Sequence, residues 1–238
     1  MGPTSIQENV LRVQERIRLA AERAGRGAEE ITLIGVSKTH PPEAIRAAYD
    51  AGVRHFGENR VQEWEGKHGA VSDLQATFHL IGHLQSNKAA RAAKLFHSID
   101  SVDDFPLAQR LDRTRSESKA PEKLRVLIEV RIAPEETKSG VTVEGLPSLA
   151  EKLLELPALE LAGLMCIPPF AEDIEETRPH FRRLRELSDE LRKRLGCALP
   201  VLSMGMSHDF EVAIEEGATE VRVGTAIFGV RGTTVVGA

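Results

Sequence analysis

Lys38 is the residue of this chain whose type and position best suit covalent chemistry. It follows residues 31–36, an apolar and β-branched run that predicts a buried strand. A charged ammonium group at the end of an apolar strand is unusual for a residue with a purely structural role. The amine of lysine condenses with aldehydes once its pKa is lowered. The position therefore raises the hypothesis of an aldehyde-cofactor pocket around Lys38.

A second candidate site, for an anion, lies near the end of the chain. The segment Ser203-Met-Gly-Met-Ser207 is small and partly polar, and it runs directly into a helix predicted over 207–216. Helix N-termini offer free N–H groups to anions, and Gly224-Thr225 adds a close-approach backbone and a hydroxyl. The alternative is that Ser207 only caps the helix and Gly224 only makes a turn.

Arg222 lies between Val221 and Val223 in the last predicted strand. Alternation along a strand turns Arg222 to the face opposite the two valines. If it faces inward, its guanidinium can donate a hydrogen bond to a ring nitrogen of a bound ligand. If it faces outward, it pairs with a helix carboxylate, and the pattern alone leaves both interpretations open.

Cys166 and the histidines near Gly82 are better explained as structural residues. No supporting base is identifiable for Cys166, which favours buried packing. His79 and His83 lack a carboxylate cluster arranged for a metal, so no metal site is expected.

Strands and helices must alternate to position these residues. A helix is predicted from the Ser5-Ile-Gln-Glu8 capping box to Gly25, and helical patterns separate the later strands. This order predicts a single (β/α)8 TIM barrel over residues 1–238 with an additional N-terminal helix; an open doubly wound sheet is the alternative. The eight predicted strands are 31–36, 53–56, 78–81, 97–99, 126–130, 161–165, 201–204 and 221–223.

Composition narrows the class of protein. A net charge of −5 without a basic run argues against nucleic-acid binding, and no apolar run approaches membrane-spanning length. Two cysteines without a secretory segment indicate reduced thiols and a cytoplasmic location. No exposed apolar stripe is obvious, so a monomer or a weak dimer is expected.

Seven motifs, in order, resemble those of the pyridoxal phosphate homeostasis proteins, single-barrel relatives of the alanine racemase group. The resemblance covers nearly the whole chain, and seven motifs together are far more specific than any one. They are Val36-Ser-Lys-Thr39, Phe56-Gly-Glu-Asn-Arg-Val-Gln-Glu63, His79-Leu-Ile-Gly-His-Leu-Gln-Ser-Asn-Lys88, Glu136-Thr-Lys-Ser-Gly140, Gly163-Leu-Met165, Leu202-Ser-Met-Gly-Met-Ser207 and Val221-Arg-Val-Gly-Thr-Ala-Ile-Phe-Gly229.

The resemblance implies a site for pyridoxal 5′-phosphate (PLP). Lys38 would hold the cofactor as a Schiff base, Asn59 would lie beside its ring, and Arg222 would face the pyridine nitrogen. Lys138 would offer a second amine. The residues expected to hold the phosphate are Ser203, Ser207, Gly224 and Thr225.

The resemblance also implies that the protein binds, buffers or delivers PLP, with PLP-dependent apo-enzymes as possible recipients, and is not an enzyme. The alternative is a small racemase-like enzyme. Racemisation needs acid–base groups on both faces of the substrate carbon, yet the single tyrosine, Tyr49, lies on the helix predicted after the first strand, where its expected role is packing. The short stretch after the last strand leaves no room for a covering domain, which favours binding over catalysis.

Overall fold

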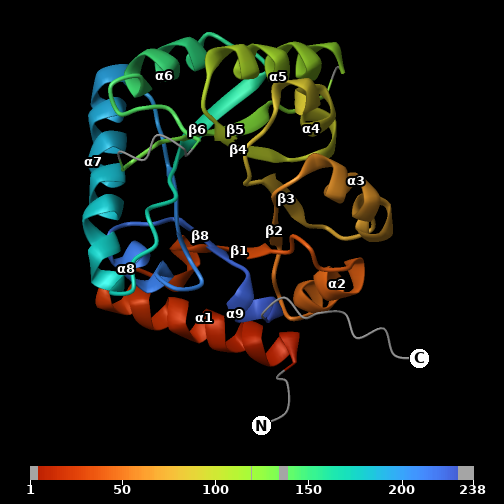
Figure 1. Cartoon of the computed structure of the whole chain (residues 1–238), viewed down its shortest axis with the longest axis vertical. Coiled ribbons are helices and arrows are strands. Elements are labelled where there is room, and N and C mark those ends of the chain that lie inside the picture. Colours follow the sequence, from red (N-terminus) through yellow and green to blue (C-terminus); the bar gives the residue numbers. More distant parts are fainter. Residues whose placement is uncertain (1–4, 119, 134–138, 230–238) are drawn as a thin grey trace.

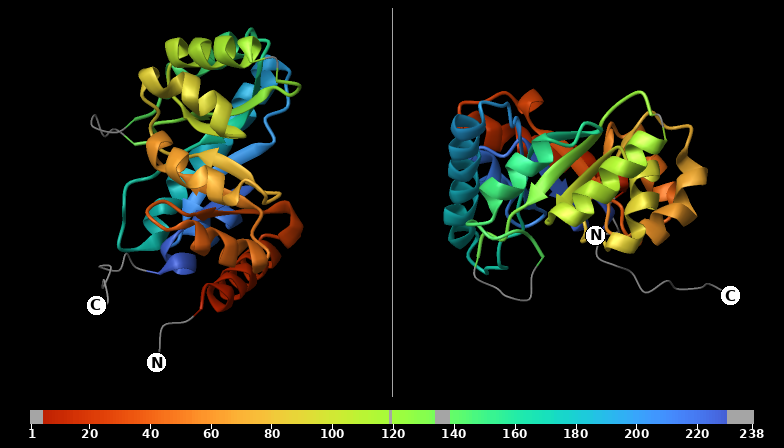
Figure 2. Two further views of the ribbon diagram at one scale, coloured as in Figure 1. Left: turned by 90° about the vertical axis from the view of Figure 1, so that its right-hand side faces the viewer. Right: turned by 90° about the horizontal axis from the view of Figure 1, so that it is seen from above.

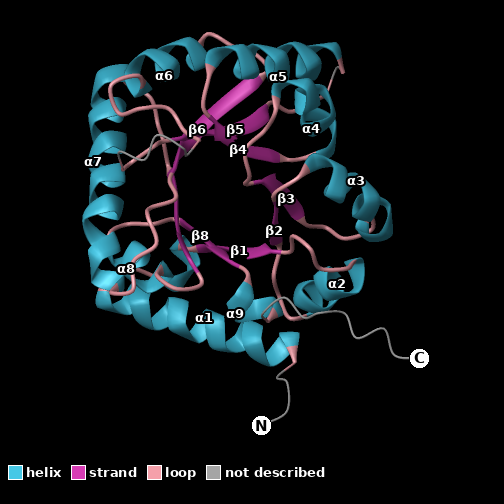
Figure 3. Cartoon of the chain, in the orientation of Figure 1, coloured by secondary structure: helices cyan, strands magenta, loops and turns pink. Residues whose placement is uncertain are grey.

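The computed structural model describes residues 5–118, 120–133 and 139–229. Eight parallel strands pair in sequence order, and β8 closes onto β1 (Figure 3). The predicted barrel is therefore confirmed, and the open doubly wound sheet is wrong. The strands are β1 (Thr32–Val36), β2 (His55–Glu58), β3 (Thr77–Leu80), β4 (Ser98–Val102), β5 (Leu124–Glu129), β6 (Leu159–Met165), β7 (Val201–Met206) and β8 (Glu220–Val223).

Helices surround the ring of strands on its outer face (Figure 1). They are α1 (Ile6–Arg23), α2 (Pro42–Asp50), α3 (Val61–His68), α4 (Ala89–Leu95), α5 (Phe105–Glu117), α6 (Leu146–Leu154), α7 (Arg178–Leu195), α8 (Phe210–Glu215) and α9 (Thr225–Phe228). Short 3₁₀ turns lie at Ala28–Glu30, Gly69–Val71, Ser86–Lys88 and Ile174–Thr177. Among the described residues, none of the helices combines the length and apolar character needed to cross a membrane.

The additional N-terminal helix takes the position that a full eighth barrel helix would occupy. Ser5 and Glu8 form the predicted capping box at the start of α1, with their reciprocal bonds at 3.1 and 3.2 Å. The helix then packs on α8, α9 and α2, as two further views show (Figure 2). Since α9 is only one turn long, α1 supplies the cover that the strands β8 and β1 need.

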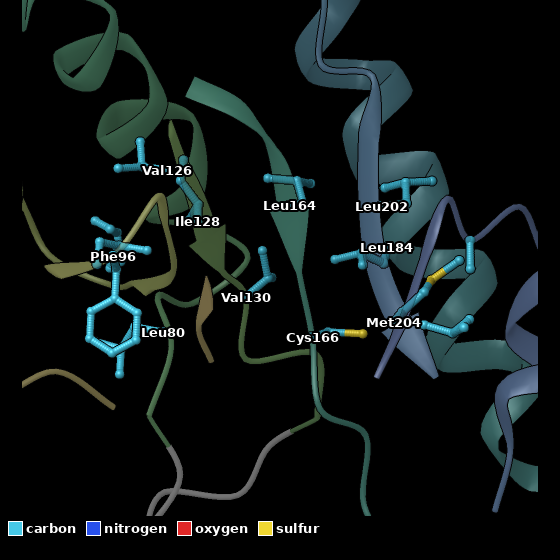
Figure 4. Packing of buried hydrophobic residues seen from close by; sticks show 14 of the residues in the cluster. Leu80, Phe96, Val126, Ile128, Val130, Leu164, Cys166, Leu184, Leu202 and Met204 are labelled. Atoms are coloured by element: carbon cyan, nitrogen blue, oxygen red, sulfur yellow. The ribbon is translucent and has the colours of Figure 1, made fainter. Parts of the chain in front are cut away.

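Alternation along the strands separates an outer core from the barrel interior. In β5, Val126 and Ile128 join the large cluster between barrel and helices (Figure 4), whereas Leu127 packs in a separate inner cluster. Arg125 and Glu129 share the inward face with Leu127. The same alternation turns Val221 and Val223 outward and Arg222 inward, which confirms the inward interpretation of Arg222.

The barrel interior holds a buried polar network that was not predicted from the sequence. His79, Asp100 and Glu220 place one ligand atom each within 4.8 Å of one another, a geometry that suits a metal ion. The Arg125 guanidinium, however, pairs with Glu220 and lies 3.9 Å from Asp100. Arg125 thus supplies positive charge beside the two carboxylates of this cluster.

Candidate functional site

The carboxyl ends of the strands enclose a cavity of about 450 Å³. Its wall brings together Lys38, Asn59, Ser207, Arg222, Gly224 and Thr225, which are all cofactor residues expected from the sequence. Ser203 is fully buried and is absent from this wall. Lys138 lies outside the described residues. The convergence of residues from β1, β2, β7 and β8 at one face agrees with the general location of active sites in such barrels.

The backbone beside Lys38 is held in an unusual conformation. Thr39 has φ of 65°, in the left-handed region that non-glycine residues seldom adopt. Its N–H donates to Oε1 of Glu63, on α3. The same carboxylate accepts from Nζ of Lys67 at 2.9 Å, so the strained turn is fastened to a neighbouring helix.

Lys67 makes most of the contacts that hold this turn in place. Its buried ammonium group donates to the backbone oxygens of Ser37 at 3.1 Å and His40 at 3.3 Å, one residue before and two residues after Lys38. It also pairs with Oε1 of Glu58 at 2.7 Å, and Ser37 Oγ donates to that same oxygen. Burial raises the pKa of Glu58, against the opposing pull of Lys67. The segment carrying Lys38 is therefore locked by a buried ion pair.

Arg222 is held rigidly on β8, the strand next to β1 in the barrel. Only 3% of the residue is exposed, and its guanidinium donates at 2.8 Å to Ser203 Oγ and at 2.8 Å to the Cys166 backbone oxygen. Ser203 Oγ thus contacts Arg222, and Ser203 is not among the residues that line the cavity. Burial raises the pKa of the Cys166 thiol to about 12, which fits the predicted packing role.

Ser207 contacts the turn after β8 at one end of the cavity. Helix α8 begins three residues after it, at Phe210, so Ser207 is not the cap that the alternative interpretation required. Its Oγ instead accepts from the N–H groups of Gly224 at 3.1 Å and Ala226 at 3.5 Å, on the turn after β8. Because both oxygen lone pairs face these donors, the hydroxyl proton is left to donate to a ligand.

Glu129 is a cavity residue that the sequence reading missed. It ends β5, is 5% exposed, and accepts from Ser139 Oγ at 2.9 Å through Oε1. Within the described part of the chain its Oε2 has no hydrogen-bond partner, and burial raises the pKa of the carboxyl group. Alternation along the strand could have identified it, because Glu129 lies on the same face of β5 as Arg125 and Leu127.

Comparison with known proteins agrees with this geometry. Residues 9–232 match the sequence profile of the alanine racemase N-terminal domain. The chain is 51% identical to a pyridoxal phosphate homeostasis protein of Aquifex aeolicus, over 94% of this chain and 97% of the relative. It is 42% identical to the protein of that name from Escherichia coli K12, over 95% and 97%.

Solved structures show the same relationship. PipY of Synechococcus elongatus, determined with PLP bound, superposes with a TM-score of 0.80 at 41% identity, covering 91% of this chain and 100% of PipY. Alanine racemase of Clostridium difficile superposes with a TM-score of 0.72 at 14% identity, covering 95% of this chain and 58% of the racemase, and so shares the fold. The chain therefore belongs to the pyridoxal phosphate homeostasis protein family, whose barrel is the alanine racemase N-terminal domain.

Proposed function

We propose that this protein binds PLP reversibly, with Lys38 as the Schiff-base residue, and buffers or delivers the cofactor in the cytoplasm. The observation that carries the proposal is the joint placement of Lys38, Arg222 and a set of hydroxyl and N–H donors on one 450 Å³ cavity. Pockets of this size suit small cofactors. PipY, which shares the fold and 41% of its aligned residues, has been determined with PLP bound.

The donor chemistry of the cavity fits each end of the ligand. The hydroxyl groups of Ser207 and Thr225 would hold the phosphate, and Gly224, whose N–H is bonded to Ser207, would let it approach the backbone closely. Arg222 would face the pyridine nitrogen and Asn59 would lie beside the ring. Bound there, PLP supplies an electrophilic aldehyde carbon and a conjugated ring. Lys138 remains a proposed second amine.

Several features support binding rather than turnover. A permanently charged arginine facing the ring nitrogen keeps that nitrogen unprotonated, which weakens the ring as an electron sink. Tyr49, the single tyrosine of the chain, lies on α2 with the Arg54 guanidinium 4.0 Å from its ring centre, and it is not on the cavity wall. The described wall therefore offers no tyrosine as a second base for racemisation.

The retention of PLP tests the binding proposal. Apo protein titrated with PLP should develop a visible absorption band, and Lys38→Ala should bind the cofactor without that band. An identical band in Lys38→Ala would count against Lys38. A chiral assay across amino acids with saturating PLP tests the second part: inversion of any one of them at enzymatic rates would favour the racemase-like function.

A further inference from the structure

A second hollow adjoins the cofactor cavity at the ends of β2 and β3. Its volume is about 820 Å³, against about 450 Å³ for the cofactor cavity. The two share Asn59, Gly82 and His83 as a common wall. We call it the β2–β3 hollow; its residues are Asn59, Arg60, Val61, Gln62, Glu63, Leu80, Gly82, His83, Leu84, Gln85 and Lys88.

Two of the seven family motifs contribute all of the residues that line this hollow. The polar residues of segments 56–63 and 79–88 that line the β2–β3 hollow are Asn59, Arg60, Gln62, Glu63, His83, Gln85 and Lys88. Of these, only Asn59 and His83 also line the cofactor cavity. Binding PLP therefore leaves Arg60, Gln62, Gln85 and Lys88 of these motifs without an assigned role.

Within the described chain, Glu63 and His83 of the hollow are paired, with Lys67 at 2.9 Å and Asp103 at 3.5 Å, but four longer polar side chains of its wall are not. No hydrogen bond or ion pair to another described residue involves the side chains of Arg60, Gln62, Gln85 or Lys88. The first turn of α3, which opens here, has no side-chain cap. Arg60, Gln62 and Gln85 are exposed. The hollow is thus an open surface lined by uncommitted donors, above a floor of Val61, Leu80 and Leu84.

The charge of the hollow is opposite to that of the whole protein. The chain carries a net charge of −5, yet Arg60 and Lys88 place two cations on this wall. The acidic residue of the wall, Glu63, is already paired with Lys67 at 2.9 Å. Although burial opposes it, the Lys67 hydrogen bond holds the pKa of Glu63 below its ordinary value. The net effect favours an acidic partner.

Glu63 also connects the hollow to the segment that carries Lys38. Its Oε1 accepts from the Thr39 N–H, at the strained turn one residue after Lys38. A partner seated on the hollow therefore lies against a residue that fixes the Lys38 backbone, and faces the shared wall of the cofactor cavity.

We propose that the β2–β3 hollow is a docking surface for an acidic, lysine-bearing segment of a protein that accepts PLP. The inference rests on the proposed delivery function. Arg60 and Lys88 would pair with carboxylates of the segment, and Gln62 and Gln85 would donate to its backbone oxygens. The hollow exceeds the cofactor cavity in volume, which suits a peptide segment better than a second vitamer. The lysine of the segment would reach the cofactor cavity past Asn59 and His83.

Binding of a designed peptide tests the surface in the absence of cofactor. The probe is a fluorescent peptide of alternating glutamate and aspartate around one lysine; its reference replaces every acid by the corresponding amide. Fluorescence anisotropy with apo protein should show the acidic peptide binding about tenfold tighter than the reference. Arg60→Glu combined with Lys88→Glu should abolish this preference. Lys94→Glu, an exposed site on neighbouring α4 outside the hollow, makes a like charge reversal and should preserve it.

A second readout uses the PLP-loaded protein. The acidic peptide should accelerate the loss of bound PLP, and a peptide with methionine in place of its lysine should not. Equal binding of acidic and amide peptides, or loss of the preference in Lys94→Glu as well, would overturn the docking proposal. The docking proposal would also be overturned if free glutamate bound as tightly as the peptide, because that result indicates a site for small anions. Since the apo experiment needs neither Lys38 nor cofactor, failure of PLP retention would leave the peptide result standing, and the reverse also holds.

Discussion

The buried pair of Lys67 and Glu58 makes a prediction about the backbone that presents Lys38. Lys67→Met removes an ammonium group that donates to Glu58, Glu63 and two backbone oxygens at 2.7 to 3.3 Å. Glu58 is fully buried and would be left as an uncompensated charge. Removing one partner of a buried ion pair costs about 3–5 kcal/mol. That is a large part of the ~5–15 kcal/mol that stabilises a typical domain.

The loss should depend on pH in a direction that follows from the Glu58 carboxyl group. Burial already raises the pKa of Glu58, and without Lys67 nothing charged opposes that rise. The folded variant then binds a proton that the unfolded chain releases, so its stability is greatest at low pH and falls as pH rises through the raised pKa. The destabilisation caused by Lys67→Met should therefore be smaller at pH 5 than at pH 8.

Urea unfolding of the wild type, of Lys67→Met and of Lys67→Met combined with Glu58→Gln measures these effects. The double variant removes the buried charge and should recover most of the loss, to within about 1–2 kcal/mol of the wild type. Lys94→Met, which removes an exposed ammonium group, is the matched control and should change stability little. The reasoning is refuted if Lys67→Met costs less than about 1 kcal/mol, or if the double variant is less stable than the single one.

Further predictions concern the cavity and the barrel interior. Ser207→Ala or Thr225→Ala should weaken PLP retention, measured by equilibrium dialysis, by about fivefold for one lost hydrogen bond. Thr225→Ala should leave the unfolding midpoint unchanged, whereas Ser207→Ala should lower it, because the N–H groups of Gly224 and Ala226 lose their acceptor while the barrel stays folded. Ser203→Ala should free Arg222 and weaken retention similarly, whereas Ser203→Thr should restore it; an unaffected dissociation constant in Ser203→Ala would contradict the positioning role. Burial, assisted by His79, lowers the pKa of His55 to about 4. The unfolded chain therefore binds a proton that the folded protein does not, and the stability of the wild type should fall as pH drops from about 6.5 towards 4. In thermal unfolding scans, His55→Asn should make this fall in the melting temperature smaller.

The architecture was predictable because each of its elements has a local signal. The apolar run before Lys38, the capping box at Ser5 and the terminal glycines mark strands and helices without reference to distant residues. Parallel strands joined by helices then bring the strand ends to one face. Alternation around Arg222 left two orientations open, and closure of β8 onto β1 in the barrel decided between them.

The parts that the sequence did not predict depend on pairs distant along the chain. The predicted second strand stopped at Phe56, whereas β2 continues to Glu58, whose buried carboxylate is compensated by Lys67. Ser203 is assigned to the support of Arg222 only once β7 and β8 are paired. Likewise, the partner of Ser207 is the turn after β8 and not its own helix, and the role of Arg125 among His79, Asp100 and Glu220 requires the closed barrel.

The identity of the lysine that holds PLP is the most direct test of this account. The protein loaded with PLP would be reduced with borohydride, digested and mapped by peptide mass spectrometry, with Lys38→Ala treated in parallel. The cavity that joins Lys38 to Arg222 and Ser207 predicts one dominant modified peptide, the one containing Lys38, and its loss in the variant. A label found chiefly on another lysine, with the Lys38 peptide unmodified, would contradict it.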